Sequence, residues 1–170
     1  MHDPEPVTIR CATADDAEIL ARLVRALAAA NGELGKVESR AADFAAHGFA
    51  AAPAFHALIA ECRGEPVGLS LWFYNFSSWR GDVGVYIQDL YVDSSLRGSG
   101  LGRRLLTETA RRGRQAGATH LRLSVARSNA GARAFYKRLG LLFRDDECIY
   151  QVSDTDFDEL ATGRQEPLTL

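Results

Sequence analysis

The chain has 170 residues, a formal net charge of −2, 46% hydrophobic residues and 25% charged residues. This length suits one domain with a substantial core, and the composition is that of an ordinary globular protein. The small negative charge argues against general nucleic-acid binding, which requires a large basic excess, although a local basic cluster can still bind a small anion.

The N-terminal part predicts a short strand followed by two helices. The stretch VTIRCAT alternates like a strand. Thr13 with Asp16 three residues later is a capping signal for a helix whose apolar residues recur at helical spacing. An Asn-Gly pair ends that helix, and Ser39 is the expected N-cap of a second, shorter helix that stops near Gly48.

Three strands are expected next. His56–Cys62 and Val67–Phe76 read as two strands around an Arg-Gly-Glu-Pro turn. After the loop SSWRGD, the run VGVYIQDLYVD is apolar on both faces. Such a run is typical of a central strand covered by helices on either side.

The C-terminal part predicts two helices and two strands. A helix runs from about Gly102 to Gln115, and THLRLSVA alternates as a strand. Ser128 or Asn129 caps a helix that stops at Gly140, and LFRDDECIYQVS is expected to form a final strand. The inner face of the first of these helices is expected to carry Leu105, Leu106, Thr109 and Ala110.

This element order predicts one α/β (α+β) domain over residues 1–170, with its core at about 7–153 and a loose tail at 162–170. The sheet is expected to be mixed and mostly antiparallel, because the order is no regular βαβ repeat. The strand–helix–strand unit from Val85 to Ala126 is the expected parallel crossover.

A glycine-rich turn stands between the central strand and the next helix. Gly98, Gly100 and Gly102 leave bare backbone at the helix start, flanked by arginines. Glycines let successive N–H groups converge, and a helix N-terminus favours an anion. The spacing fits neither the P-loop nor the dinucleotide pattern. The turn therefore predicts a phosphate or diphosphate site, with a simple tight connection as the alternative.

At this turn the sequence resembles a known family. RGSGLG, at Arg97–Gly102, is similar to the Arg/Gln-x-x-Gly-x-Gly/Ala signature of the GNAT superfamily of N-acetyltransferases. About 25 residues later, VARSNAGARAFYKRLG resembles a second stretch of that superfamily. Within it, the chain looks most like the diamine (spermidine/spermine) and thialysine acetyltransferases, from about Ile9 to Tyr150.

The resemblance implies that acetyl-CoA binds where two parallel strands splay apart, here those ending at Val92 and Ala126. Backbone groups of the first strand would pair with the pantetheine arm, and the glycine turn would hold the diphosphate. Arg103, Arg104 or Lys137 would reach the 3′-phosphate, with solvated surface charge as the alternative for each. The expected cofactor-binding residues are Leu90, Tyr91, Val92, Arg97, Gly98, Ser99, Gly100, Leu101, Gly102, Arg103, Asn129, Arg133 and Lys137.

Tyr136 and Asp89 are the expected catalytic residues. The resemblance gives Tyr136 the role of protonating the thiolate leaving group, and a core tyrosine beside Phe135 is the alternative. The diamine enzymes carry Glu-Asp where this chain has Gln88-Asp89, so the usual glutamate base is missing. Either Asp89 relays the amine proton through water or it anchors the following loop.

The acceptor is expected to be a small-molecule amine. Gln88, Trp79 and Asn31 are the expected substrate-binding residues, although an aromatic hairpin end such as the one around Trp79 is more often a core or dimer contact. The early Tyr-Glu pair of the diamine enzymes is replaced by Ala30-Asn31, which disfavours polyamines. The alternatives are a protein lysine or N-terminal acetyltransferase, and a non-catalytic acyl-CoA sensor.

Cysteine usage and targeting signals complete these expectations. The three cysteines lack metal or disulfide spacing, the N-terminus lacks a signal peptide, and no apolar run approaches the roughly 18 residues of a membrane helix. We expect a cytoplasmic enzyme without a metal, without nucleic-acid or membrane partners, and by resemblance a homodimer.

Overall fold

The structure, a computed structural model, describes residues 7–163. Two compact units divide the chain, Met1–Arg133 and Ala134–Leu170, with the boundary inside one helix. The first unit holds β1 (Val7–Cys11), α1 (Ala17–Ala30), α2 (Ala41–Gly48), β2 (His56–Cys62), β3 (Glu65–Ser77), β4 (Asp82–Val92), α3 (Leu101–Gln115), β5 (His120–Leu123) and the start of α4 (Ala130–Arg138), with short 3₁₀ turns at Ala14–Asp16, Leu34–Lys36 and Ser94–Leu96. The second unit holds the end of α4 and α5 (Asp154–Thr162).

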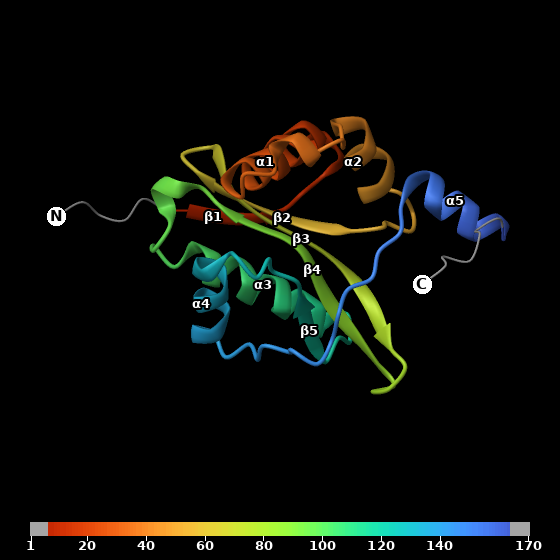
Figure 1. Ribbon diagram of the computed structural model, residues 1–170. Coiled ribbons are helices and arrows are strands. Elements are labelled where there is room, and N and C mark those ends of the chain that lie inside the picture. Colours follow the sequence, from red (N-terminus) through yellow and green to blue (C-terminus); the bar gives the residue numbers. More distant parts are fainter. Residues whose placement is uncertain (1–6, 164–170) are drawn as a thin grey trace. The chain divides into compact units, whose positions relative to one another are not determined.

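The five strands form one sheet in the order β1-β2-β3-β4-β5. The pairs β1–β2, β2–β3 and β3–β4 are antiparallel, and β4–β5 is parallel. In the first unit, α1 and α2 lie over one face of the sheet and α3 over the other (Figure 1). The predicted mixed, mostly antiparallel sheet with helices on both faces and one parallel pair is confirmed.

The core between the sheet and α1 is formed by residues that alternate along the strands. Leu20 of α1 and Ile59 and Leu69 of the sheet are fully buried there, with Phe44 contributed by α2. Burial of such apolar side chains is worth about 1.5–3 kcal/mol each. This face therefore supplies much of the stability of the unit.

A buried hydroxyl pair fastens α3 to the opposite face. Thr109 Oγ1 donates to the Leu105 carbonyl at 2.9 Å and lies 2.8 Å from Ser70 Oγ. Because a hydroxyl has only one proton to donate, Ser70 must be the donor to Thr109. Gly113 packs close to the sheet as well, since an added Cβ would overlap the Val85 side chain.

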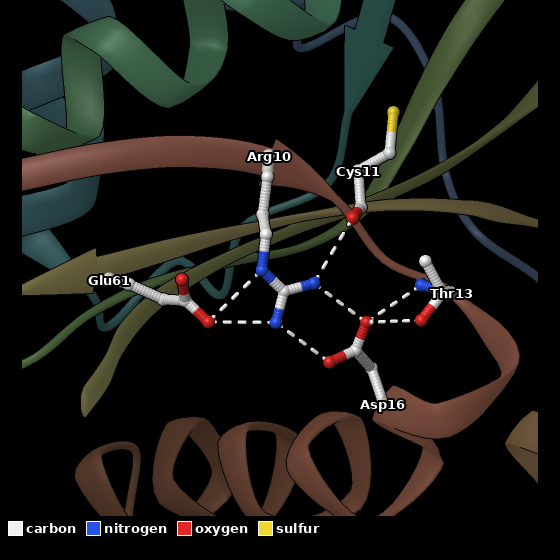
Figure 2. Close-up of polar contacts among 5 residues, drawn as sticks. All are labelled: Arg10, Cys11, Thr13, Asp16 and Glu61. Atoms are coloured by element: carbon white, nitrogen blue, oxygen red, sulfur yellow. Dashed lines mark hydrogen bonds and ion pairs between the residues drawn. The ribbon is translucent and has the colours of Figure 1, made fainter. Parts of the chain in front are cut away.

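An ion-pair network links β1 to β2 and to the turn that precedes α1 (Figure 2). Arg10 on β1 donates from Nη1 and Nη2 to the Asp16 carboxylate at 2.7 and 2.8 Å, and from Nε and Nη2 to Glu61 on β2 at 3.0 and 2.7 Å. With a bond from Nη1 to the Cys11 carbonyl, every guanidinium N–H has an acceptor. Asp16 also accepts from the backbone and hydroxyl of Thr13, which confirms the predicted capping signal.

Several predicted boundaries need correction. The N-cap of α2 is Arg40 rather than Ser39, and Asp43 accepts the Arg40 amide at 2.7 Å. The β2–β3 turn is only Arg63-Gly64, both with positive φ, so the predicted four-residue turn is too long. Ala110 is exposed and does not belong to the inner face of α3.

The predicted strand over residues 142–153 is wrong, because residues 141–153 form no strand and α5, which the sequence does not predict, follows them. The strand THLRLSVA is also shorter than predicted and ends at Leu123. Of the predicted loose tail, residues 164–170 lie outside the described part of the chain, while Thr162 ends α5.

Candidate functional site

The parallel strand pair separates within the first unit. β4 and β5 are paired only from Gly84 with His120 to Ile87 with Leu123, whereas β4 continues to Val92. Beyond Ile87, the edge of β4 that faces β5 therefore has no strand partner among the described residues. This separation is what the predicted splayed pair requires.

The free edge of β4 offers the backbone groups of two residues. The Asp93 amide donates to the Val67 carbonyl of the β3 side at 2.8 Å. Because successive backbone groups point to opposite edges of a strand, Tyr91 also faces β3, while Leu90 and Val92 face the free edge. Of the three residues predicted to pair with an extended ligand, only Leu90 and Val92 thus direct their backbone N–H and C=O groups toward the free edge of β4.

The glycine turn collects unpaired amides at the start of α3. Gly98 and Gly100 have φ of +83° and +88°, a conformation that L side chains rarely adopt. Within residues 7–163, the amides of Gly98, Gly100, Gly102 and Arg103 donate to no acceptor. We call these the free turn amides; with the positive end of the α3 dipole they suit an anion.

The remaining predicted amides of the turn are already bonded. The Arg97 amide donates to the Ser94 carbonyl at 3.3 Å, and the Ser99 amide donates to the Leu96 carbonyl at 3.3 Å. The Leu101 amide donates to Ser99 Oγ at 3.4 Å. These bonds hold the loop in shape and leave the free turn amides as the available donors.

The arginines around the turn differ in how they are engaged. Arg104 donates to the Val7 carbonyl at 2.7 Å and so ties α3 to β1, and Arg97 donates to the Val92 carbonyl at 3.3 Å. Arg103 is exposed and has no partner in the described part of the chain. Arg103 is therefore the arginine whose charge is fully available to an anion.

Asn31, a predicted substrate-binding residue, and Asn129, a predicted cofactor-binding residue, lie side by side. Asn129 Nδ2 donates to Asn31 Oδ1 at 3.4 Å, and Asn129 Oδ1 accepts the Ala132 amide at 3.0 Å. Asn129 is thus the N-cap of α4 that the sequence predicts. Arg133 donates to the Arg127 carbonyl at 3.1 Å.

A β-bulge separates the roles of Gln88 and Asp89. Leu71 pairs with Asp89 and Trp72 pairs with Ile87, so Gln88 is an extra residue in β4. Gln88 is exposed, whereas Asp89 is half-buried. Paired residues share a face, so Asp89 lies with Leu71 on the α1 side. Nothing in the sequence of β4 indicates this bulge, because the run is apolar on both faces.

Burial changes the acid–base properties of Asp89. It raises the pKa of the carboxyl group to about 6, and the side chain has no hydrogen-bond or ion-pair partner in residues 7–163. A carboxylate without a bound proton donor or cation keeps its lone pairs available. Asp89 can therefore accept a proton near neutral pH, as a general base must.

Tyr136 and Lys137 belong to the second unit. Tyr136 is half-buried on α4, its ring edge-on to Phe135 at 5.2 Å, and burial raises the pKa of the phenol. A phenol with a raised pKa stays protonated and can donate a proton. Lys137 is exposed. Their roles toward a ligand remain predictions.

Trp79 lies apart from the other predicted substrate residues of the first unit. It is fully exposed in the loop between β3 and β4, ahead of Asp82. At about 3.3 Å per residue, the strand separates it from Gln88 by roughly 20 Å. The structure therefore does not bring Trp79 beside Gln88 within one chain.

Residues 7–163 hold neither a cluster of metal ligands nor a membrane-spanning helix. No group of His, Cys, Asp and Glu in that range is arranged to hold a metal ion. No helix in the same range is long and apolar enough to cross a membrane.

Comparisons with known proteins agree on one family. The sequence profile of the "Acetyltransferase (GNAT) family" matches residues 21–141. The thialysine N-epsilon-acetyltransferase of Bos taurus is 34% identical over 142 residues, which cover 79% of this chain and 83% of that protein. The spermidine/spermine N(1)-acetyltransferase-like protein 1 of Homo sapiens is 35% identical over 105 residues, covering 58% of this chain and 15% of that protein.

Solved structures with lower identity share the fold. An integron cassette protein from V. cholerae has a TM-score of 0.76 at 19% identity, covering 91% of this chain and 97% of its own. An aminoglycoside acetyltransferase from an uncultured soil metagenomic sample, in complex with sisomicin, has a TM-score of 0.73 at 16% identity, covering 86% and 97%.

Proposed function

Because this chain belongs to the GNAT family of acetyltransferases and is thus an N-acetyltransferase, we propose that it acetylates the primary amine of a small molecule. Enzymes of this family use acetyl-CoA as cosubstrate. The free turn amides beside the unpaired edge of β4 are the observation that carries the proposal. A turn with these donors suits a diphosphate, and a strand edge suits an extended amide-containing arm.

Acetyl-CoA supplies the thioester that is attacked. In the proposed binding mode, Leu90 and Val92 pair with the pantetheine amides, and the free turn amides with Arg103 hold the diphosphate. Asn129, Arg133 and Lys137 are the further predicted contacts. The engaged Arg104 is a weaker candidate for phosphate, since it already bonds β1.

The proposed reaction needs one proton acceptor and one proton donor. The amine nitrogen forms a bond to the thioester carbonyl carbon, and the carbon–sulfur bond breaks. Asp89, directly or through water, takes the proton that the amine loses, and Tyr136 donates a proton to the departing thiolate. The raised pKa of each group supports its role, because Asp89 becomes a stronger base and Tyr136 stays protonated at neutral pH.

The acceptor is proposed to be an amine with few positive charges. A thialysine acetyltransferase is among the relatives, and Gln88 offers no charge to a polycation. A primary alkylamine with a pKa near ~10.4 is only about 0.1% neutral at physiological pH, whereas an amine near ~7.8 is roughly a third neutral. Without a glutamate at position 88, amines of lower pKa are the better substrates.

An amine panel tests the proposal. Thiol release from acetyl-CoA would be followed with a thialysine-like amino acid, spermidine, an aminoglycoside and a lysine peptide. We expect release with small amines of low pKa and a loss of about 10²–10⁴ in rate for Tyr136→Phe. Release with the peptide alone would favour a protein acetyltransferase, and binding without release would favour a sensor.

We also propose a cytoplasmic homodimer. Cys11, Cys62 and Cys148 form no disulfide, which supports a reducing compartment. Phe76 is 67% exposed and Trp79 fully exposed at the end of the β3–β4 hairpin. Exposed aromatics of this kind are typical of protein contacts. Light scattering at several concentrations would test the dimer, and a mass of one chain throughout would contradict it.

A further inference from the structure

A hollow lies in the first unit, away from every residue predicted for catalysis or cofactor binding. Its volume is about 500 Å³, within the range of roughly 300–1,000 Å³ that small-molecule sites occupy. It opens beyond the end of β1, between the β2–β3 wall and the last turn of α3. Its lining includes Cys11, His56, Trp72, Tyr74, Arg112 and Gln115.

The wall of this hollow is aromatic. His56 and Trp72 are paired across β2 and β3, and their rings stack with centroids 5.6 Å apart. The Tyr74 ring lies 5.1 Å from His56. Burial lowers the pKa of His56, so its imidazole is neutral at neutral pH and presents an uncharged ring. The His56 and Tyr74 planes are inclined by 57°, so the three rings form an angled, uncharged aromatic wall, and a planar group can stack on one of its faces.

Unsatisfied polar groups accompany these rings. Trp72 is only 2% exposed, and its Nε1 has no acceptor among the described residues. The ring nitrogens of His56 also lack a partner in residues 7–163. A buried donor without an acceptor costs roughly 1–3 kcal/mol, and a ligand acceptor would relieve that cost.

The hollow also carries one positive charge in excess. Glu108 accepts from Arg111 at 2.8 and 2.7 Å and from Arg112 Nε at 2.9 Å, so two guanidinium groups share one carboxylate. Arg112 lines the hollow, and its two Nη groups have no partner in the described chain. No acidic residue lines the hollow.

The end of α3 does little to offset that charge. A helix C-terminus carries a partial negative charge from its unpaired carbonyls. Here the Arg112 and Gly113 carbonyls accept the amides of Ala116 and Ala118 at 3.1 and 2.9 Å. The potential in the hollow is therefore set mainly by Arg112.

We propose that this hollow is a second small-molecule site, which binds an aromatic carboxylate between the His56–Trp72–Tyr74 wall and the Arg112 guanidinium. It is separate from the proposed acetyl-CoA site. The 15 residues of α3 place the glycine turn about 20 Å from Arg112. Asp89 lies on the opposite face of the sheet, with Leu71.

Tryptophan fluorescence tests the site directly. Trp79→Phe leaves Trp72 as the sole tryptophan. In that background we expect phenylacetate to change the emission saturably, and its neutral analogue phenylacetamide to bind roughly tenfold more weakly. Arg112→Gln should remove this preference. Arg111→Gln is the matched control, because Arg111 also donates to Glu108, through two hydrogen bonds, but does not line the hollow.

Cysteine alkylation gives a second readout in the unmodified protein. Phenylacetate should slow iodoacetamide labelling of Cys11, which lines the hollow, and leave labelling of the exposed Cys148 unchanged, as read by peptide mass spectrometry. Equal effects of phenylacetate and phenylacetamide, or an Arg112→Gln variant that keeps the preference, would overturn the proposal. Unaltered Cys11 labelling at saturating phenylacetate would overturn it as well.

Discussion

Asp16 and Asp89 are two partly or fully buried carboxylates of the same unit whose surroundings act in opposite directions. Asp16 is 5% exposed, and the hydrogen bonds from Arg10 are the largest cause that lowers its pKa to about 2. Asp89 is half-buried without a partner in the described residues, and burial raises its pKa to about 6. A paired carboxylate stabilises the fold as an anion, whereas an unpaired one retains a proton more tightly and destabilises the fold when ionised.

This difference indicates which carboxylate can take part in chemistry. Asp16 accepts four hydrogen bonds, two from Arg10 and two from Thr13, so its negative charge is already engaged within the fold. Asp89 stands after a bulge, beside the free edge of β4, with its oxygens unengaged. Buried, unsatisfied groups of this kind are enriched at functional sites.

The largest effect is expected for Asp89→Asn on acetyl transfer. Loss of a general base should lower kcat by about 10²–10⁴ and remove the ascending limb of the pH–rate profile near pH 6. The profile would be measured at saturating acetyl-CoA with one amine. Asp16→Asn is the control and should keep the limb. An unchanged profile in Asp89→Asn would exclude Asp89 as the base.

Asp16→Asn should have the largest effect on stability, about 3 kcal/mol in the free energy of unfolding at pH 7. The change removes the bidentate partner of Arg10 and leaves Glu61 as its remaining carboxylate. The folded pKa lies below the unfolded value of 3.8, so roughly 2 kcal/mol of the wild-type stability should be present above pH 4 and lost toward pH 2. Urea titrations between pH 7 and pH 2 would measure the loss at pH 7 and the decrease in stability toward low pH. A variant whose stability falls toward pH 2 as much as that of the wild type would contradict this role of Asp16.

Asp89→Asn should have the opposite sign and a similar size, a gain of about 3 kcal/mol in unfolding free energy at pH 7. A carboxyl group whose folded pKa is raised binds its proton more tightly in the folded state, so its contribution becomes unfavourable as pH rises from about 4 through about 6. The gain should therefore vanish near pH 4. Thermal melts of both proteins at the two pH values are the measurement. An equal gain at both would point to packing instead of charge.

Gln88→Glu should have the smallest effect, less than about tenfold in kcat/KM. Residue 88 is exposed at the bulge, and a second carboxylate beside Asp89 would raise the pKa of Asp89 further. We expect this effect to be an increase in kcat/KM that is confined to amines of high pKa such as spermidine. A competition assay between spermidine and a thialysine-like amino acid would measure this preference, with Gln88→Ala as the neutral control.

The sequence was a good guide at several positions where local chemistry decides the structure. The Thr13–Asp16 capping signal and the Asn-Gly stop after α1 lie where they were predicted. The positive φ of Gly98 and Gly100 follows the pattern of the turn as well. In each case a side chain or a glycine fixes its own backbone, so the neighbouring residues carry the information.

Features that depend on distant partners were not predictable in the same way. The bulge at Gln88 arises from the register of β3 against β4, and the Asn31–Asn129 contact joins residues 98 positions apart. The run over 142–153 has strand propensity, yet strand formation also needs a pairing edge, which propensity alone does not supply. The contrast between Asp16 and Asp89 was likewise hidden, because it depends on Arg10 and on burial.

Gly113 packs directly against the Val85 side chain, so the position of α3 on the sheet depends on the size of residue 113. The Ser70–Thr109 hydroxyl pair lies one turn nearer the N-terminus of α3 and holds the helix to the sheet at that point. A methyl group at residue 113 would push the C-terminal end of α3 away from the sheet. The helix would tilt as a rigid body about the Ser70–Thr109 contact, which would move the glycine turn at its N-terminal end. A substitution remote from the proposed diphosphate site would in this way change the positions of the free turn amides.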